Sequence, residues 1–167
     1  DIDPTSPAHK QLVQFDCTDW DFIVTRAEAN GMLVFTDNGK LVIKKPVMPP
    51  MALLTATYGA NIWEFETEMD ARRQIQSVTA TSWDYTNQAN ESSQNGTATF
   101  SESGNLMSTD LASVLSAEIK LTHPGHLEQN HLQHWAYAYA LRNKLSKAVG
   151  RVRITGNATV KPGTMIT

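Results

Sequence analysis

Five side chains able to bind metal or transfer protons lie close together in the sequence: His123, His126, Glu128, His131 and His134. On a helix, Glu128, His131 and His134 follow one another at i, i+3 spacing and share one face. Imidazole and carboxylate groups on one face can hold zinc, so these three are weak candidates for the metal ligands of a hydrolase. The sequence lacks both the H-E-x-x-H motif and the paired cysteines of zinc deaminases. We therefore expect a solvated or subunit-facing helix edge, with no metal and no cofactor.

Other catalytic motifs are missing from the sequence. It contains neither the G-x-S-x-G nucleophile elbow nor the G-x-x-x-x-G-K-[ST] phosphate loop. Asp19 and Asp21 are two residues apart, so on a helix they point in different directions and suit the positive helix N-terminus better than paired acid–base catalysis. We expect no enzymatic activity and no catalytic residue.

Composition and charge indicate a soluble globular chain with an uneven charge distribution. Of the 167 residues, 41% are hydrophobic and 19% charged, and no apolar run reaches the roughly 18 residues that cross a bilayer. We expect no stable membrane insertion. Residues 1–128 carry 17 acidic and 8 basic side chains, whereas residues 129–167 carry six basic ones and no acid. No aromatic-basic motif accompanies the basic end, so we expect it to face an acidic protein surface and not nucleic acid.

The N-terminal third predicts a helix and a hairpin. Thr18 can cap a helix whose apolar residues repeat at helical spacing between residues 20 and 27. Asn38 and Gly39 separate two β-rich runs, 32–36 and 41–44, and predict a type I′ hairpin. Prolines between residues 46 and 50 then indicate a connector.

The remaining residues predict strands and one long helix. Apolar and acidic residues alternate over 62–69, which is typical of a strand with one acidic face, and the runs 11–15, 74–83, 118–122, 151–155, 158–160 and 165–166 are further strand candidates. The polar stretch of about 85–105 predicts a surface excursion and is the segment most typical of disorder. Residues 127–149 predict a helix that Gly150 ends.

Together these elements predict an α+β fold. We expect a helix-plus-hairpin lobe at residues 1–57. An antiparallel, partly barrel-like β domain at residues 58–167 should follow it, with the long helix at about 127–149 and the polar insert at about 85–105.

The run from Gln11 to Gly31 carries a recognisable pattern, D-W-D-F followed by R-A-E-x-N-G. This run resembles a segment of VgrG, Rhs-element Vgr proteins and related phage late-control or baseplate-hub proteins. Residues 68–74, 82–84, 132–136, 150–154 and 161–166 look like later landmarks of the same hub region in the same order. The resemblance covers nearly the whole chain.

The resemblance implies a phage tail hub-like structural fragment of a contractile injection machine, such as a type VI secretion spike or a phage baseplate. It implies a homotrimeric adaptor that contacts a tail-tube protein (Hcp-like) and the spike and neck domains. It also implies assembly in the bacterial cytoplasm and ejection to the extracellular space or a target cell. The alternatives are the metal-dependent hydrolase and a surface- or carbohydrate-binding β module, which the Trp, Tyr and Asn content indicates.

Two groups of residues follow from these expectations. The candidates for subunit contacts are charged residues of the acidic strand and of the basic C-terminal part: Glu64, Glu66, Glu68, Arg142, Lys144, Arg151 and Arg153. The candidates for core packing are aromatic: Trp20, Trp63, Phe65, Trp83, Trp135 and Tyr139.

Overall fold

The computed structural model describes residues 1–9 and 11–167. In chain order its elements are α1 (Asp19–Ala29), β1 (Leu33–Asp37), β2 (Lys40–Lys44), β3 (Ile62–Met69), the 3-10 helix η1 (Ala71–Arg73), β4 (Ser77–Asp84), β5 (Ala89–Ser92), α2 (Ser108–Leu115), β6 (Glu118–His123), α3 (Gln129–Leu145) and β7 (Ala148–Ile154). The predicted α+β class is confirmed. The partly barrel-like sheet is wrong, because these strands divide among three small sheets, β1–β2, β3–β7 and β5–β4–β6.

The helix and the hairpin near the N-terminus form where the sequence predicts them. The hydroxyl of Thr18 accepts a hydrogen bond of 3.1 Å from the backbone N–H of Asp21 and so caps α1. The β1–β2 hairpin turns at Asn38 and Gly39, whose φ angles are 50° and 74°, as a type I′ turn requires. α1 packs on both β1 and α3. The predicted domain boundary at residue 57 stays a prediction.

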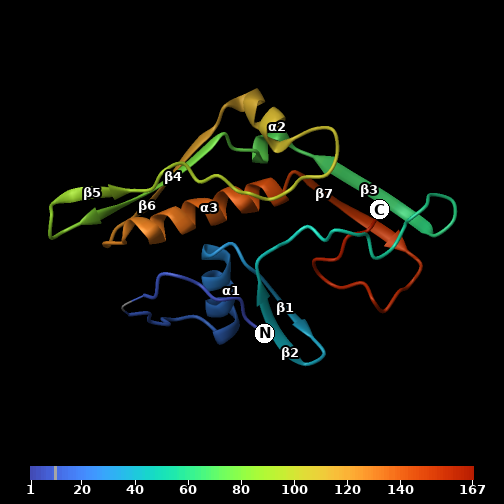
Figure 1. Cartoon of the computed structure of the whole chain (residues 1–167), viewed down its shortest axis with the longest axis horizontal. Coiled ribbons are helices and arrows are strands. Elements are labelled where there is room, and N and C mark those ends of the chain that lie inside the picture. Colours follow the sequence, from blue (N-terminus) through green and yellow to red (C-terminus); the bar gives the residue numbers. More distant parts are fainter. Residues whose placement is uncertain (10) are drawn as a thin grey trace.

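The core lies between α3 and the β5–β4–β6 sheet (Figure 1). Its buried centre consists of Val78 and Ala80 from β4 and of Leu132 and Ala136 from α3. β4 pairs antiparallel with β5 but parallel with β6, so the prediction of an antiparallel domain is wrong at this pair. A parallel pair needs a crossover connection, and here the chain from β5 through α2 supplies it.

The aromatic residues predicted to pack in the core divide into two groups. Trp135 and Tyr139 lie against the buried cluster on α3. The structure does not place the other four in the core, since they remain exposed over a large part of their surface: Trp20 (49%), Trp63 (73%), Phe65 (58%) and Trp83 (39%). A periodic pattern indicates which side chains share a face, but it does not say whether a second layer covers that face.

The polar segment of residues 85–105 lies mostly at the surface, as predicted, and includes the short strand β5, but after β5 it is hydrogen-bonded to the core. Its backbone continues along β4: Ser93 and Gly96 donate hydrogen bonds of 2.8 Å to the carbonyls of Ala80 and Val78. In return, the N–H groups of Ala80 and Val78 donate to the side-chain oxygens of Ser93 (2.8 Å) and Asn95 (3.0 Å). Polar side chains therefore complete the edge of β4 where the regular ladder ends.

The β3–β7 pair forms an antiparallel ribbon that extends away from the end of α3 (Figure 1). The predicted helix end at Gly150 is wrong: α3 ends at Leu145, because residues 148–150 pair with β3. A side chain at Gly150 would collide with the carbonyl oxygen of Glu66, so this position requires glycine for close approach of the two strands.

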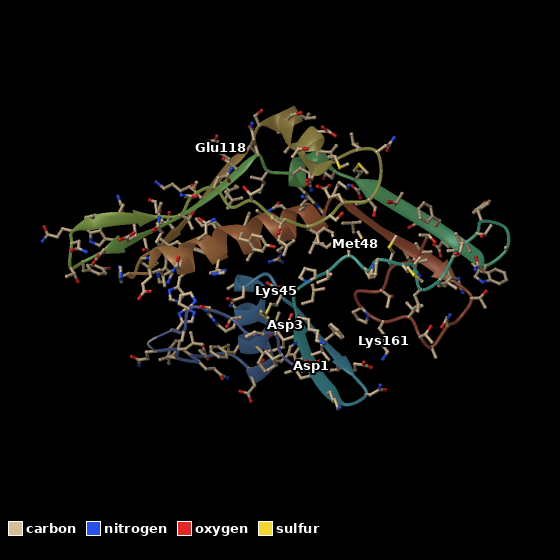
Figure 2. The ribbon with its side chains drawn as sticks, viewed as in Figure 1. Asp1, Asp3, Lys45, Met48, Glu118 and Lys161 are labelled. Carbon is tan, nitrogen blue, oxygen red and sulfur yellow. The ribbon has the colours of Figure 1, made fainter. Side chains whose placement is uncertain are left out.

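Hydrogen bonds, ion pairs and isolated bridges hold the segments that lie outside the helices and strands. Figure 2 shows Asp1, Asp3 and Lys45 near the hairpin, where the Asp3 carboxylate accepts a hydrogen bond of 3.0 Å from the Lys45 backbone N–H. Lys161 forms an ion pair of 2.9 Å with Asp37 at the end of β1. The strands predicted at 11–15, 158–160 and 165–166 do not form; Ile166 makes an isolated bridge to Leu54. Within residues 1–9 and 11–167, none of the helices combines the length and apolar character needed to cross a lipid bilayer.

Candidate functional site

The β3–β7 ribbon has one apolar and one charged face. Residues directly opposite each other in an antiparallel pair share a face. Phe65 lies opposite Val152, and both are exposed, as is Met69 at the end of the same strand face. Trp63 sits at the irregularity between Ile62 and Glu64, where the register shifts. This apolar face, made of Trp63, Phe65, Met69 and Val152, has no second layer over it in the described chain.

The opposite face of the ribbon carries most of the charged residues predicted as subunit contacts. Glu64 lies opposite Arg153 and Glu66 opposite Arg151, so an acidic row on β3 runs beside a basic row on β7. Within the described residues, none of these four side chains takes part in an ion pair of 4.0 Å or less. Their charges are therefore free to interact with a neighbouring surface.

Two other predicted contact residues are engaged within the chain. Arg142 on α3 forms an ion pair of 3.1 Å with Glu28 on α1, which links these helices. Lys144 pairs at 3.1 Å with Glu102, and its side chain is only 21% exposed.

Glu102 is the centre of a network that joins three segments. Its carboxylate forms ion pairs with Lys144 and Lys147 at 3.1 and 3.0 Å, and it accepts hydrogen bonds from the backbone N–H and hydroxyl of Ser108 at 2.8 and 2.7 Å. The Lys147 ammonium also donates to the carbonyls of Ser103 and Leu106. Burial alone would raise the pKa of Glu102, but the bonds from Ser108 and the two lysines lower it to about 2. The network ties residues 102–108 to the last turn of α3 and to Lys147 after it.

This network was hard to predict from the sequence. Glu102 is a single acid in a polar stretch, and its two lysine partners lie more than 40 residues away. The one usable signal was the i, i+3 spacing of Lys144 and Lys147, which puts both ammonium groups on one side of the helix end.

The predicted metal ligands are not brought together. Among residues 1–9 and 11–167, no group of three or more His, Cys, Asp and Glu side chains is placed to hold a metal ion. His134 is exposed on α3, whereas His131 turns toward the N-terminal segment and stacks on His9 with ring centroids 4.5 Å apart. The structure therefore does not support a hydrolase that uses Glu128, His131 and His134 as metal ligands.

A cavity of about 400 Å³ lies where the N-terminal segment and α1 meet the start of α3. Its walls include His9, Arg26, His123, His126 and His131. The Arg26 guanidinium lies 2.9 Å from His9 Nε2, so that nitrogen acts as the acceptor. Burial, with Arg26 and His131 nearby, lowers the pKa of His9. Sequence reasoning missed His9 and Arg26, because no spacing relates them to the later histidines.

The comparisons with known proteins give one family and one fold. The family model described as "Alg8 N-terminal domain" matches residues 1–167. Among solved structures, the chain is similar to the 43 kDa tail protein of prophage MuSo2 from Shewanella oneidensis, with a TM-score of 0.52 and 14% identity, over 98% of this chain and 45% of that one. The chain thus spans less than half of that protein's length, and at this identity the likeness shows the fold alone. No curated protein matches the chain.

The family match overturns the assignment based on the D-W-D-F pattern. The resemblance to VgrG and Rhs-element Vgr proteins is wrong as a family assignment, and with it the role as spike or hub of an injection machine and the ejection from the bacterial cytoplasm. The homotrimer stays a prediction. The prediction of tail-tube and spike partners depended on the resemblance to VgrG and therefore loses its support. Because the match extends over the entire sequence, the chain belongs to the family of the Alg8 N-terminal domain.

Proposed function

We propose that this chain is a non-catalytic assembly domain of a glycosyltransferase-related protein, and that copies of it associate through their β3–β7 ribbons. The family description supports the glycosyltransferase-related setting. The observation that carries the assembly role is the ribbon itself, with its uncovered apolar face and its separate acidic and basic rows.

The energetics of a two-stranded ribbon favour a partner. An isolated two-stranded sheet is marginal in water, and its stability increases when a hydrophobic face is covered or a further strand is added. Both β3 and β7 are edge strands, because among the described residues neither pairs with a further strand, apart from an isolated bridge between Ile62 and Tyr58. Each outer edge offers backbone N–H and C=O groups to an added strand. A partner that covers Phe65 and Trp63 buries large apolar side chains, which is the main source of favourable association energy.

The charge rows favour a second copy of this chain as the partner. When β3 of one copy lies beside β7 of the next, the row of Glu64, Glu66 and Glu68 faces the row of Arg151 and Arg153. Such head-to-tail contacts use two different surfaces and close into a ring when the rotation between copies permits it, which is compatible with the predicted homotrimer. A glycan partner would use the aromatic side chains but not the strand edges or the charge rows.

Exchange of the apolar residues gives the first test. Phe65→Ser combined with Trp63→Ser should shift the protein from oligomer to monomer in sedimentation velocity, and the thermal midpoint should no longer rise with protein concentration as it does for an associating wild type. Val114→Ser, on α2 and 69% exposed, is the matched control and should leave the oligomer unchanged.

Charge reversal gives the second arm of the same test. Glu66→Arg and Arg151→Glu should each weaken association on their own, and an equimolar mixture of the two variants should restore it, because the changed row of one variant then faces a complementary row of the other while the repulsion within each ribbon stays. A wild-type chain that sediments as a monomer at every concentration contradicts the proposal. If the monomer instead shows a Trp63-dependent fluorescence change with oligosaccharides, the ribbon is a glycan-binding face and the assembly role is wrong.

A further inference from the structure

The cavity at the start of α3 has an unusual set of polar walls. His131 lines it, and both ring nitrogens of His131 are buried without a hydrogen-bond partner within the described chain. A neutral imidazole has one donor and one acceptor nitrogen, and a protonated one has two donors. Leaving both atoms buried and unpaired costs free energy, so this side chain indicates a ligand or ordered water in the cavity.

The side chain of Arg26 also indicates a ligand in this cavity. Its guanidinium lies at the cavity wall against His9 Nε2 and, among the ion pairs of residues 1–9 and 11–167, it has no carboxylate partner. A guanidinium presents several N–H groups in a planar fork, and one imidazole nitrogen occupies only part of this capacity. The remaining donors suit a doubly charged oxyanion with several acceptor oxygens.

The surrounding side chains offer hydrogen-bond donors to an anion, with Arg26 as the fixed positive charge among the described lining residues. His9, His123, His126 and His131 line the same cavity as Arg26, and Glu128 is the carboxylate among its lining residues. Glu128 is the N-cap residue of α3, and its side chain makes no capping hydrogen bond, so the first N–H groups of this 17-residue helix receive no acceptor from that side chain. Among the described lining residues, His126 has an acidic neighbour, Asp84, at 3.9 Å.

From this arrangement we infer that the cavity binds a phosphate group, held by Arg26 together with the imidazoles of His131 and His9. The volume of about 400 Å³ accommodates a phosphate with part of the molecule that carries it. The shared chemistry is that of a phosphate or diphosphate, whether free or as an ester. This site is separate from the β3–β7 ribbon and does not depend on the assembly role.

The test uses inorganic phosphate and pyrophosphate as probes. Addition of either anion should shift the ring nitrogen signals of His131 in ¹⁵N NMR of the whole chain, and calorimetry gives the affinity. Arg26→Gln should reduce the affinity at least tenfold. Arg73→Gln removes the same charge from the exposed η1 segment and should leave the affinity unchanged. Tighter binding of pyrophosphate than of phosphate would identify a diphosphate as the natural group.

A second variant keeps the test valid if Arg26→Gln disturbs the fold. His9→Ala changes an exposed residue of the N-terminal segment and should weaken phosphate binding several-fold while the circular dichroism spectrum stays the same. The inference fails if the His131 signals do not respond to either anion. It also fails if Arg26→Gln and Arg73→Gln bind phosphate as the wild type does, since the binding is then unspecific.

Discussion

Glu102→Gln is expected to lower the free energy of unfolding at pH 7 by about 3 kcal/mol, which corresponds to a decrease in Tm of roughly 6–12 °C for a domain of this size. The substitution keeps the shape of the side chain but removes the charge that two ammonium groups face. The side chain of Lys147 is 10% exposed, so its charge would remain largely buried without a counter-charge. Urea unfolding followed by circular dichroism measures the difference.

The pH dependence of this effect follows from the pKa of Glu102, which is about 2 in the folded chain against an ordinary value of 4.5. Because the folded pKa is the lower one, the carboxylate stabilises the fold above pH 4.5, and this contribution is lost as the pH falls from about 4.5 to about 2. The difference in unfolding free energy between wild type and variant should therefore fall to roughly half or less at about pH 3.

Glu118→Gln is the matched control for Glu102→Gln. Glu118 is exposed at the start of β6 (Figure 2) and forms no ion pair within the described residues. Its substitution should change the unfolding free energy by less than about 0.5 kcal/mol at either pH. Equal losses for both variants, or a loss for Glu102→Gln that does not depend on pH, would show that the network does not stabilise the fold.

Gly96→Ala is expected to destabilise the chain by about 2–3 kcal/mol. A Cβ at this position would collide with the carbonyl group of Ala136 and would lie 2.9 Å from the backbone nitrogen of Tyr137. The obstacle is the backbone of α3, which cannot rotate away as a side chain can. To relieve the collision, the segment after β5 must move off the helix and lose the 2.8 Å hydrogen bond from Gly96 to Val78.

Gly156→Ala is the comparison for this effect. A Cβ at Gly156 meets no atom within 4 Å, and its φ is not in the left-handed region, so alanine should be tolerated there. Hydrogen exchange can localise the change: in Gly96→Ala the amides of Val78 and Ala80 should lose protection, whereas in Gly156→Ala they should not. Unchanged stability of Gly96→Ala would mean that the segment does not lie against α3 in solution.

The sequence predicted local structure well where a local cause decides it. The Thr18 cap, the Asn38-Gly39 turn and the alternation over 62–69 each depend on residues within a few positions of one another, and each forms as expected. The errors concern long-range pairing. Residues 148–150 continue the helical pattern but pair with β3, and residues 93–96 look like a loop but extend the edge of β4. Tertiary contacts override local propensity at both places.

The candidate sites were less predictable than the fold. The histidines after residue 122 suggested a metal, but the partner of His131 is His9, which is far away in the sequence. The alternation in β3 correctly separated an acidic face from an apolar one, and yet Trp63 and Phe65 are exposed. Whether an apolar face is internal or available to a partner depends on what the rest of the chain places over it, and no single strand encodes this.

The pairing of β3 with β7 affects how the chain folds while it is being synthesised. More than eighty residues separate the end of β3 at Met69 from the end of β7 at Ile154. At a synthesis rate of 5–20 residues per second, β3 waits on the order of 10 s for its partner strand. During that interval the strand that carries Trp63, Phe65 and Met69 has an unpaired backbone, so its apolar face is open to contacts with other chains while translation continues.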